Sequence, residues 1–171
     1  MPLSLFNLRE NDEFGVFEIG MDKKGEIDYL SKIIKPDVGV ITNISYAHIK
    51  NFKNIHQVAL AKSEIINNIK TNGFLVLNQD DKFYNLHKKI AKKKKINILT
   101  FGLKNKSADI FLEKIVKEKS KYKIFVNINK KQTYFYVRSI FENNLKNLLA
   151  AIAIISIYKD TQKLDKNIFF D

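Results

Sequence analysis

The chain has 171 residues, a length that fits one domain with a hydrophobic core. It has no cysteine, so disulfides and thiolate metal sites are excluded and a reducing compartment is expected. The net charge of +12 comes almost entirely from lysine, with Arg9 and Arg138 the only arginines. Because base recognition and bidentate phosphate binding favour arginine, we expect no nucleic-acid partner.

Neither a membrane span nor a secretion signal is visible in the sequence. The longest purely apolar run, residues 148–155, is far shorter than the roughly 20 residues that cross a bilayer. Residues 1–12 lack the basic region and the following apolar region of a signal peptide. We therefore expect a cytoplasmic protein with no membrane partner.

Short apolar runs alternate with helical periodicity through residues 1–102. The apolar runs predict strands at residues 14–20, 37–43, 73–78 and 96–102. The spacing of apolar residues predicts helices at residues 25–34, 55–69 and 80–94, the first ended by Pro36 and the last capped by Asp80. Strands that alternate with helices of this length indicate a parallel sheet with helices on both faces.

The pattern changes after Gly102. Three runs rich in aromatic and β-branched residues, within residues 103–140, predict a small antiparallel meander. Residues 141–160 contain a helix that is apolar on nearly every side, so we expect it to be buried. The sequence thus predicts one α/β domain, with a parallel sheet and flanking helices at 1–102, the meander at 103–140 and the buried helix at 141–160.

Lys62 lies in the middle of the apolar stripe of the predicted helix 55–69. A lysine in such a place either extends its ammonium past the stripe into solvent or takes part in chemistry. Burial lowers the pKa of an amine and makes it nucleophilic. The sequence leaves both interpretations open, and the solvated ammonium is the commoner case.

Glu18 and His48 are two further polar residues in unusual places. Glu18 interrupts the apolar run 14–20 near its carboxyl end, and His48 follows the next predicted strand. Ligands of open parallel sheets bind outside the carboxyl ends of the strands. If these two strands are neighbours, both side chains converge on one point, which Lys62 reaches from the side. A carboxylate and an imidazole can hold a divalent metal ion, whereas an ion pair and a structural hydrogen bond are the alternatives.

Several short motifs occur here in the order and spacing of one known family. The motifs “FEIG” (17–20), “GEI” (25–27), “TNI” (42–44), “AH” (47–48) and “AKSEI” (61–65) resemble the central, ATP-binding domain of the Mur ligases. The run “NLLAAIAI” (147–154) resembles a helix of that domain. The resemblance covers the chain from Pro2 to about Tyr158. It is greatest to the members that join D-alanyl-D-alanine to UDP-N-acetylmuramoyl-tripeptide.

The resemblance implies a role for each unusual polar residue. Glu18 and His48 match positions that hold a magnesium ion near the transferred phosphate. Lys62 matches a lysine that carries a carbamate in several Mur ligases, and Asn147 matches an asparagine that contacts the nucleotide. ATP and Mg²⁺ are therefore the expected cofactors.

The resemblance also implies a reaction and its partners. ATP phosphorylates the carboxyl group of UDP-N-acetylmuramoyl-tripeptide, and the amino group of D-Ala-D-Ala then attacks the acyl phosphate. The products are an amide, ADP and phosphate. The full-length enzyme is expected to be a monomer that acts in peptidoglycan precursor synthesis, and so in cell shape and cell division.

Two features depart from the family pattern. No phosphate-binding loop of the form G-x-x-x-x-G-K-[ST] occurs in the sequence. Asn143 stands where the family usually has the histidine of G-x-H-N. The N-terminal and C-terminal domains of the family have no counterpart either. We therefore interpret the chain as a fragment of such a ligase and expect the 171 residues alone to be inactive.

Alternatives remain open at this point. Within the same class, the enzyme could be another Mur-type ligase or a folylpolyglutamate synthetase, which differ in the acceptor. A different class is a basic module that binds nucleic acid through residues 88–95, and such binding would fall steeply with salt. A further alternative is a non-catalytic Mur-like scaffold, in which replacing Glu18 or His48 would leave magnesium binding unchanged.

Overall fold

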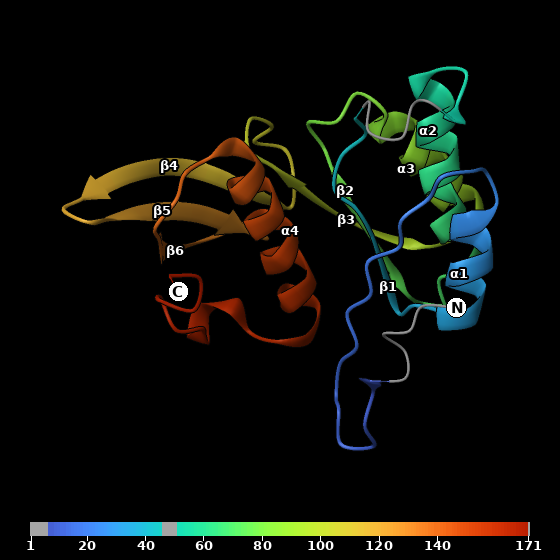
Figure 1. Cartoon of the computed structure of the whole chain (residues 1–171). Coiled ribbons are helices and arrows are strands. Elements are labelled where there is room, and N and C mark those ends of the chain that lie inside the picture. The colour runs from blue at the N-terminus through green and yellow to red at the C-terminus, as the bar shows by residue number, and fades with distance from the viewer. Residues whose placement is uncertain (1–6, 46–50, 171) are drawn as a thin grey trace.

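The computed structural model describes residues 7–45 and 51–170, and its framework is one six-stranded sheet (Figure 1). The strands follow one another across the sheet in the order in which they occur in the chain. β1, β2 and β3 are parallel, whereas β4, β5 and β6 are antiparallel. The strands are β1 (Val38–Ile41), β2 (Phe74–Asn78), β3 (Asn97–Gly102), β4 (Ile110–Glu118), β5 (Lys121–Ile128) and β6 (Lys131–Val137).

A short parallel pairing of β3 with β4 joins the two parts of the sheet. Phe101 pairs with Ile110 and Gly102 pairs with Phe111. The predicted meander is therefore confirmed, but it continues the parallel sheet instead of forming a sheet of its own. The predicted α/β class with a parallel sheet is confirmed as well.

Each predicted helix is present, but the one at 80–94 begins later, at Tyr84, and the one at 55–69 is divided. The described helices are α1 (Glu26–Ile34), α2 (Ile55–Lys62), α3 (Tyr84–Lys93) and α4 (Glu142–Tyr158), with the 3-10 helices η3 (Ser63–Asn68) and η4 (Thr161–Lys163). The single helix predicted at 55–69 is thus two elements, because the turns tighten after Lys62.

Helices cover both faces of the parallel strands, as alternating apolar side chains require. On one face, Val76 and Phe101 share a core with Leu149 of α4, and this core continues under the meander. On the other face, Leu75 and Leu77 share a core with apolar residues of α1, α2, η3 and α3. Figure 1 accordingly shows α4 on one side of the sheet and α1, α2 and α3 on the other.

The strand predicted at residues 14–20 is absent from the described fold. Phe14 is 55% exposed and Val16 is 94% exposed, and no strand pairing joins this segment to the sheet, whose edge is β1. Figure 1 shows it as an irregular trace near the blue end of the chain. An apolar run becomes a strand only where a neighbour satisfies its backbone groups, so the prediction from local pattern is wrong here.

The prediction that the last long helix is buried on nearly every side also needs correction. One side of α4, which includes Leu145, Leu149 and Ile152, is buried against the sheet. The remaining apolar residues are half-buried, and Tyr158 is 47% exposed. Neither α4 nor any other helix in the described part of the chain is long and apolar enough to span a membrane.

Candidate active site

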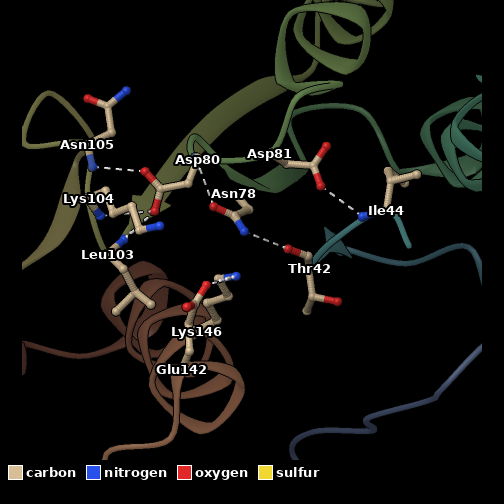
Figure 2. A network of polar contacts seen from close by, with 10 residues as sticks. All are labelled: Thr42, Ile44, Asn78, Asp80, Asp81, Leu103, Lys104, Asn105, Glu142 and Lys146. Carbon is tan, nitrogen blue, oxygen red and sulfur yellow. Dashed lines mark hydrogen bonds and ion pairs between the residues drawn. The ribbon is translucent and has the colours of Figure 1, made fainter. Parts of the chain in front are cut away.

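The loops after β2 and β3 are joined by one carboxylate at the carboxyl edge of the parallel sheet (Figure 2). Asp80, in the loop after β2, accepts hydrogen bonds from the backbone N–H groups of Leu103, Lys104 and Asn105. The three donor–acceptor distances are 2.6, 3.1 and 2.8 Å. A carboxylate that accepts several N–H groups fixes the loop that supplies them.

Asp80 does not cap α3, so that prediction is wrong. The helix begins at Tyr84, later than predicted. Asp81 is the carboxylate nearer its start, and it accepts from the N–H of Phe83 at 2.8 Å. The carboxylate of Asp80 instead accepts hydrogen bonds from the backbone of the loop after β3.

Asn78 and Asp81 fix the loop after β1 in the same way. Asn78 is 4% exposed, and its Nδ2 donates to the carbonyl of Thr42 at 3.0 Å. Its Oδ1 accepts from the N–H of Asp80 at 2.9 Å. Asp81 Oδ2 accepts from the N–H of Ile44 at 2.8 Å. Figure 2 shows these contacts side by side, so side chains at the end of β2 and in the loop after it order the backbone of both neighbouring loops.

Lys62 reaches the loop after β1 from the end of α2. It is the last residue of that helix and is half-buried. Its Nζ lies 3.5 Å from the carbonyl oxygen of Asn43, a long contact. No carboxylate of the described residues is ion-paired with it. The ammonium therefore lies at the carboxyl edge of the sheet. It is neither fully solvated nor fully buried, so both interpretations of Lys62 stay open.

Glu18 is exposed, in the irregular segment before α1. Its carboxylate is not buried in a sheet, and no ion pair holds it within the described part of the chain, so the ion-pair alternative is not observed there. The reason is that residues 14–20 form no strand and no sheet surrounds them. His48 lies outside the described residues, and the convergence of Glu18 with His48 therefore stays a prediction.

The start of α4 adjoins the same edge of the sheet. Glu142 and Lys146 form an ion pair of 2.6 Å there, and Figure 2 shows it near the loop after β3. The hydrogen bond from Lys146 holds the pKa of Glu142 below its usual range. The charges of Lys146 and Lys104 act in the same direction, and the charge of Asp80 opposes them. Asn147, the predicted nucleotide contact, is exposed on this helix.

The described donors fit part of a magnesium site. No group of three or more His, Asp or Glu suited to a metal ion occurs in residues 7–45 and 51–170. Magnesium bound with a nucleotide usually takes only one or two carboxylates, with phosphate oxygens and waters completing the shell. The accessible carboxylate of Glu18 suits such an ion. Lys62 becomes an anionic oxygen donor only as a carbamate.

His87 of α3 is buried against α2. It is 1% exposed, and its Nε2 lies 3.1 Å from the carbonyl oxygen of Ala59. Burial lowers the pKa of His87, and the charge of Lys62 adds to this effect. The hydrogen bond to Ala59 and the charge of Asp81 act in the opposite direction. A neutral imidazole that donates from Nε2 explains the contact, which joins α3 to α2.

Asn78 and Asp81 were missed in the sequence. One signal could have found them, the polar run “NQDD” (78–81) directly after an apolar strand. His48 was predicted as a site residue for the same reason, because it follows an apolar strand. The lysine side chains of Lys89, Lys92 and Lys93 on α3 are exposed.

Comparison with known proteins shows which family this chain is similar to. The family model of the Mur ligase middle domain matches residues 1–155. The UDP-N-acetylmuramoyl-tripeptide–D-alanyl-D-alanine ligase of Rickettsia prowazekii is 34% identical over 157 residues, and the match covers 90% of this chain and 35% of that protein. The ligase of the same name from Buchnera aphidicola subsp. Baizongia pistaciae is 30% identical over 154 residues, with 90% and 33% covered. The chain thus spans about a third of the length of these curated relatives.

Solved structures show the same fold. The crystal structure of MurF from Acinetobacter baumannii superimposes with a TM-score of 0.82 at 28% identity, across 92% of this chain and 34% of that chain. The MurF ligase from Thermotoga maritima, solved in complex with ADP, has a TM-score of 0.74 at 23% identity, across 87% and 33%. The predicted α/β fold and the predicted resemblance are both confirmed.

Proposed function

Because the chain belongs to the Mur ligase middle-domain family, we propose that it forms part of the nucleotide- and magnesium-binding centre of an ATP-dependent ligase. The proposed reaction joins D-Ala-D-Ala to UDP-N-acetylmuramoyl-tripeptide, as the names of its relatives state for those proteins. The match to the family over residues 1–155 carries this proposal. The position of Lys62, the lysine of the “AKSEI” motif, beside the loop after β1 supports it.

The proposed chemistry has two steps. A carboxylate oxygen of the tripeptide attacks the γ-phosphorus of ATP, and ADP leaves. The amino nitrogen of D-Ala-D-Ala then attacks the carbonyl carbon of the acyl phosphate, phosphate leaves, and the nitrogen loses a proton to form the amide. Bound Mg²⁺ supplies neutralisation of the phosphate charge.

Glu18 and His48 are the residues that we propose to hold this ion. Lys62, once converted to a carbamate, would add an anionic oxygen at the loop after β1, where its amine already lies 3.5 Å from the Asn43 carbonyl. The network of Asn78 and its neighbours would keep these loops in place, so that little reorganisation is needed when substrate binds.

Asn147 would contact the nucleotide from α4. Its amide is exposed and offers both donors and an acceptor to a purine or a ribose. Asn143, which replaces the family's histidine, is exposed as well. An amide can donate a hydrogen bond there but cannot titrate near neutral pH, so nucleotide binding at this position would not depend on pH.

An acceptor assay tests the proposal. The complete translated protein is supplied with ATP, Mg²⁺, UDP-N-acetylmuramoyl-tripeptide and labelled D-Ala-D-Ala, and the labelled pentapeptide product is measured. We expect product with D-Ala-D-Ala and none when L-alanine or glutamate replaces it. Product with one of those acceptors on its own substrate would instead identify another Mur-type ligase or a folylpolyglutamate synthetase.

Absence of product with every acceptor would support the non-catalytic scaffold. The proposed reaction would take place in the bacterial cytoplasm, where ATP is available. The 171-residue chain alone serves as the negative control, since it contains no phosphate-binding loop of the Walker type.

A further inference from the structure

α1 begins at a residue that has no side chain to cap it. Gly25 is the N-cap, with a φ of 92° that favours glycine. Glu64 of η3 supplies the missing acceptor, with Oε1 and Oε2 at 2.9 and 3.0 Å from the N–H of Gly25. Oε2 also accepts from the N–H of Asp28 at 3.2 Å. A negative charge at a helix N-terminus is stabilising, so a glutamate 39 positions away acts as the cap of α1.

The turn that precedes α1 is held from its other side as well. Met21 is 5% exposed and packs in the core with α1 and α2. Glu26 accepts from the N–H groups of Asp22 and Lys23 at 2.6 and 3.0 Å. This turn therefore has little conformational freedom. Glu18 lies three residues before Met21, at the end of the segment that the turn anchors.

Glu64 lies two residues after Lys62, where α2 passes into η3. Its hydrogen bond to Gly25 therefore ties the segment that carries Glu18 to the helix that carries Lys62. We propose that Glu64 is a positioning residue, which sets the separation between the carboxylate of Glu18 and the amine of Lys62. This inference rests on the proposed function, in which both groups serve one site.

Asn68 offers a matched control. It joins the same two elements, because its Nδ2 donates to Ser31 Oγ at 2.9 Å and to the carbonyl of Asp28 at 3.0 Å. These contacts are inside α1 and not at the turn before it. Loss of the Asn68 side chain therefore loosens the packing of α1 on η3 without removing the acceptor for Gly25.

The test compares the 171-residue chain with its Glu64→Gln and Asn68→Ala variants. Amide hydrogen exchange is measured at Gly25, and the affinity for Mn²⁺, a probe for the magnesium site, is measured by electron paramagnetic resonance. For Glu64→Gln we expect faster exchange at Gly25 and an affinity lower by about tenfold to a hundredfold, as for other residues that orient a metal ligand. For Asn68→Ala we expect a lower denaturation midpoint and an unchanged Mn²⁺ affinity.

Two results would overturn the positioning role. Faster exchange in Glu64→Gln with unchanged Mn²⁺ affinity leaves Glu64 as a helix cap alone. An equal loss of affinity in both variants means that general loosening explains the effect. If Glu64→Gln does not fold, Glu64→Asp replaces it with the same expectations, since it keeps the charge but shortens the reach.

Failure of the proposed function is recognised separately. A wild-type chain that keeps slow exchange at Gly25 but binds no Mn²⁺ refutes the metal site itself, and the positioning role with it. That result is obtained before any variant is compared. It is therefore distinct from the other negative outcome, in which the wild-type chain binds Mn²⁺ and the Glu64 variant binds it equally well. That outcome refutes only the positioning role.

Discussion

The side-chain amide of Asn78 donates a hydrogen bond of 3.0 Å to the backbone carbonyl of Thr42, and so joins the end of β2 to the loop after β1. The donor is buried, since Asn78 is 4% exposed. A buried donor without a partner is destabilising by more than the hydrogen bond itself contributes, so this contact selects the direction in which the loop leaves the sheet. The Asn43 carbonyl that faces Lys62 belongs to the same loop.

Replacing Asn78 with aspartate tests this contact. The variant keeps the acceptor for the N–H of Asp80 but sets a carboxylate oxygen against the carbonyl of Thr42. We expect the free energy of unfolding to fall by about 1–3 kcal/mol, measured by urea denaturation. Asn97→Asp is the control, because exposed Asn97 donates to a backbone carbonyl at the same distance of 3.0 Å. Equal losses in both variants would contradict a special role for the buried contact.

Gly73 should not tolerate a side chain. A Cβ at this position would lie 2.6 Å from the carbonyl oxygen of Asp37 and 2.6 Å from a methyl carbon of Ile69. We expect Gly73→Ala to destabilise the fold by about 1–3 kcal/mol, in thermal or urea denaturation. At Gly20 a Cβ would meet no atom within 4 Å. Gly20→Ala should therefore leave the stability unchanged or raise it by up to about 1 kcal/mol.

Buried His87 should make the stability of the chain depend on pH. Burial holds its pKa below the value of 6.5 for a free histidine. Below about pH 6.5 the unfolded chain therefore binds a proton that the folded chain does not, so stability is present above that pH and is lost as the pH falls toward the folded pKa. Urea midpoints at about pH 8 and pH 5.5 measure this loss.

Two glutamine variants identify the histidine responsible. His87→Gln keeps a donor for the carbonyl of Ala59 but cannot titrate, so the part of the pH dependence that comes from His87 should disappear. His56 is exposed, and His56→Gln should keep the slope of the wild type. An unchanged slope in His87→Gln would show that carboxylates alone cause the acid loss.

Lys62 should form a carbamate more readily than an ordinary surface lysine. Its ammonium has no carboxylate partner among the described residues, whereas the ammonium of Lys70 lies 2.9 Å from Asp37. Conversion of Lys70 to an anion would set two negative charges against each other. With ¹³C-labelled bicarbonate we expect a carbamate signal in the NMR spectrum that is lost in Lys62→Gln and kept in Lys70→Gln. The reverse pattern would contradict the proposed role of Lys62.

Much of the fold could be predicted because its signals are local. β1, β2 and β3 follow short apolar runs, and the hairpins of β4 to β6 follow runs of aromatic and β-branched residues separated by polar turns. Residues 14–20 carry the same kind of signal but pair with no described strand. Strand formation depends on a neighbour as well as on propensity, and the neighbour is not a local property.

The site was predicted only in part for a similar reason. Lys62 was visible because a charge within an apolar stripe stands out in the sequence. Glu64, Asn78 and Asp81 bind backbone groups 39, 36 and 37 positions away. Residue types do not reveal which distant N–H or carbonyl is left to be satisfied, so these three residues emerge only from the folded chain.

The convergence of Glu18 with the loop after β1 is most directly tested by Mn²⁺ titration of the ¹⁵N-labelled chain, observed by NMR. Bound Mn²⁺ broadens nearby amide signals. We predict broadening at Glu18 and at Thr42 to Ile44 together, lost in Glu18→Gln and kept in Glu13→Gln, which alters an exposed carboxylate of the same segment. Broadening that leaves out the loop after β1, or that Glu18→Gln does not change, would contradict the proposed magnesium site.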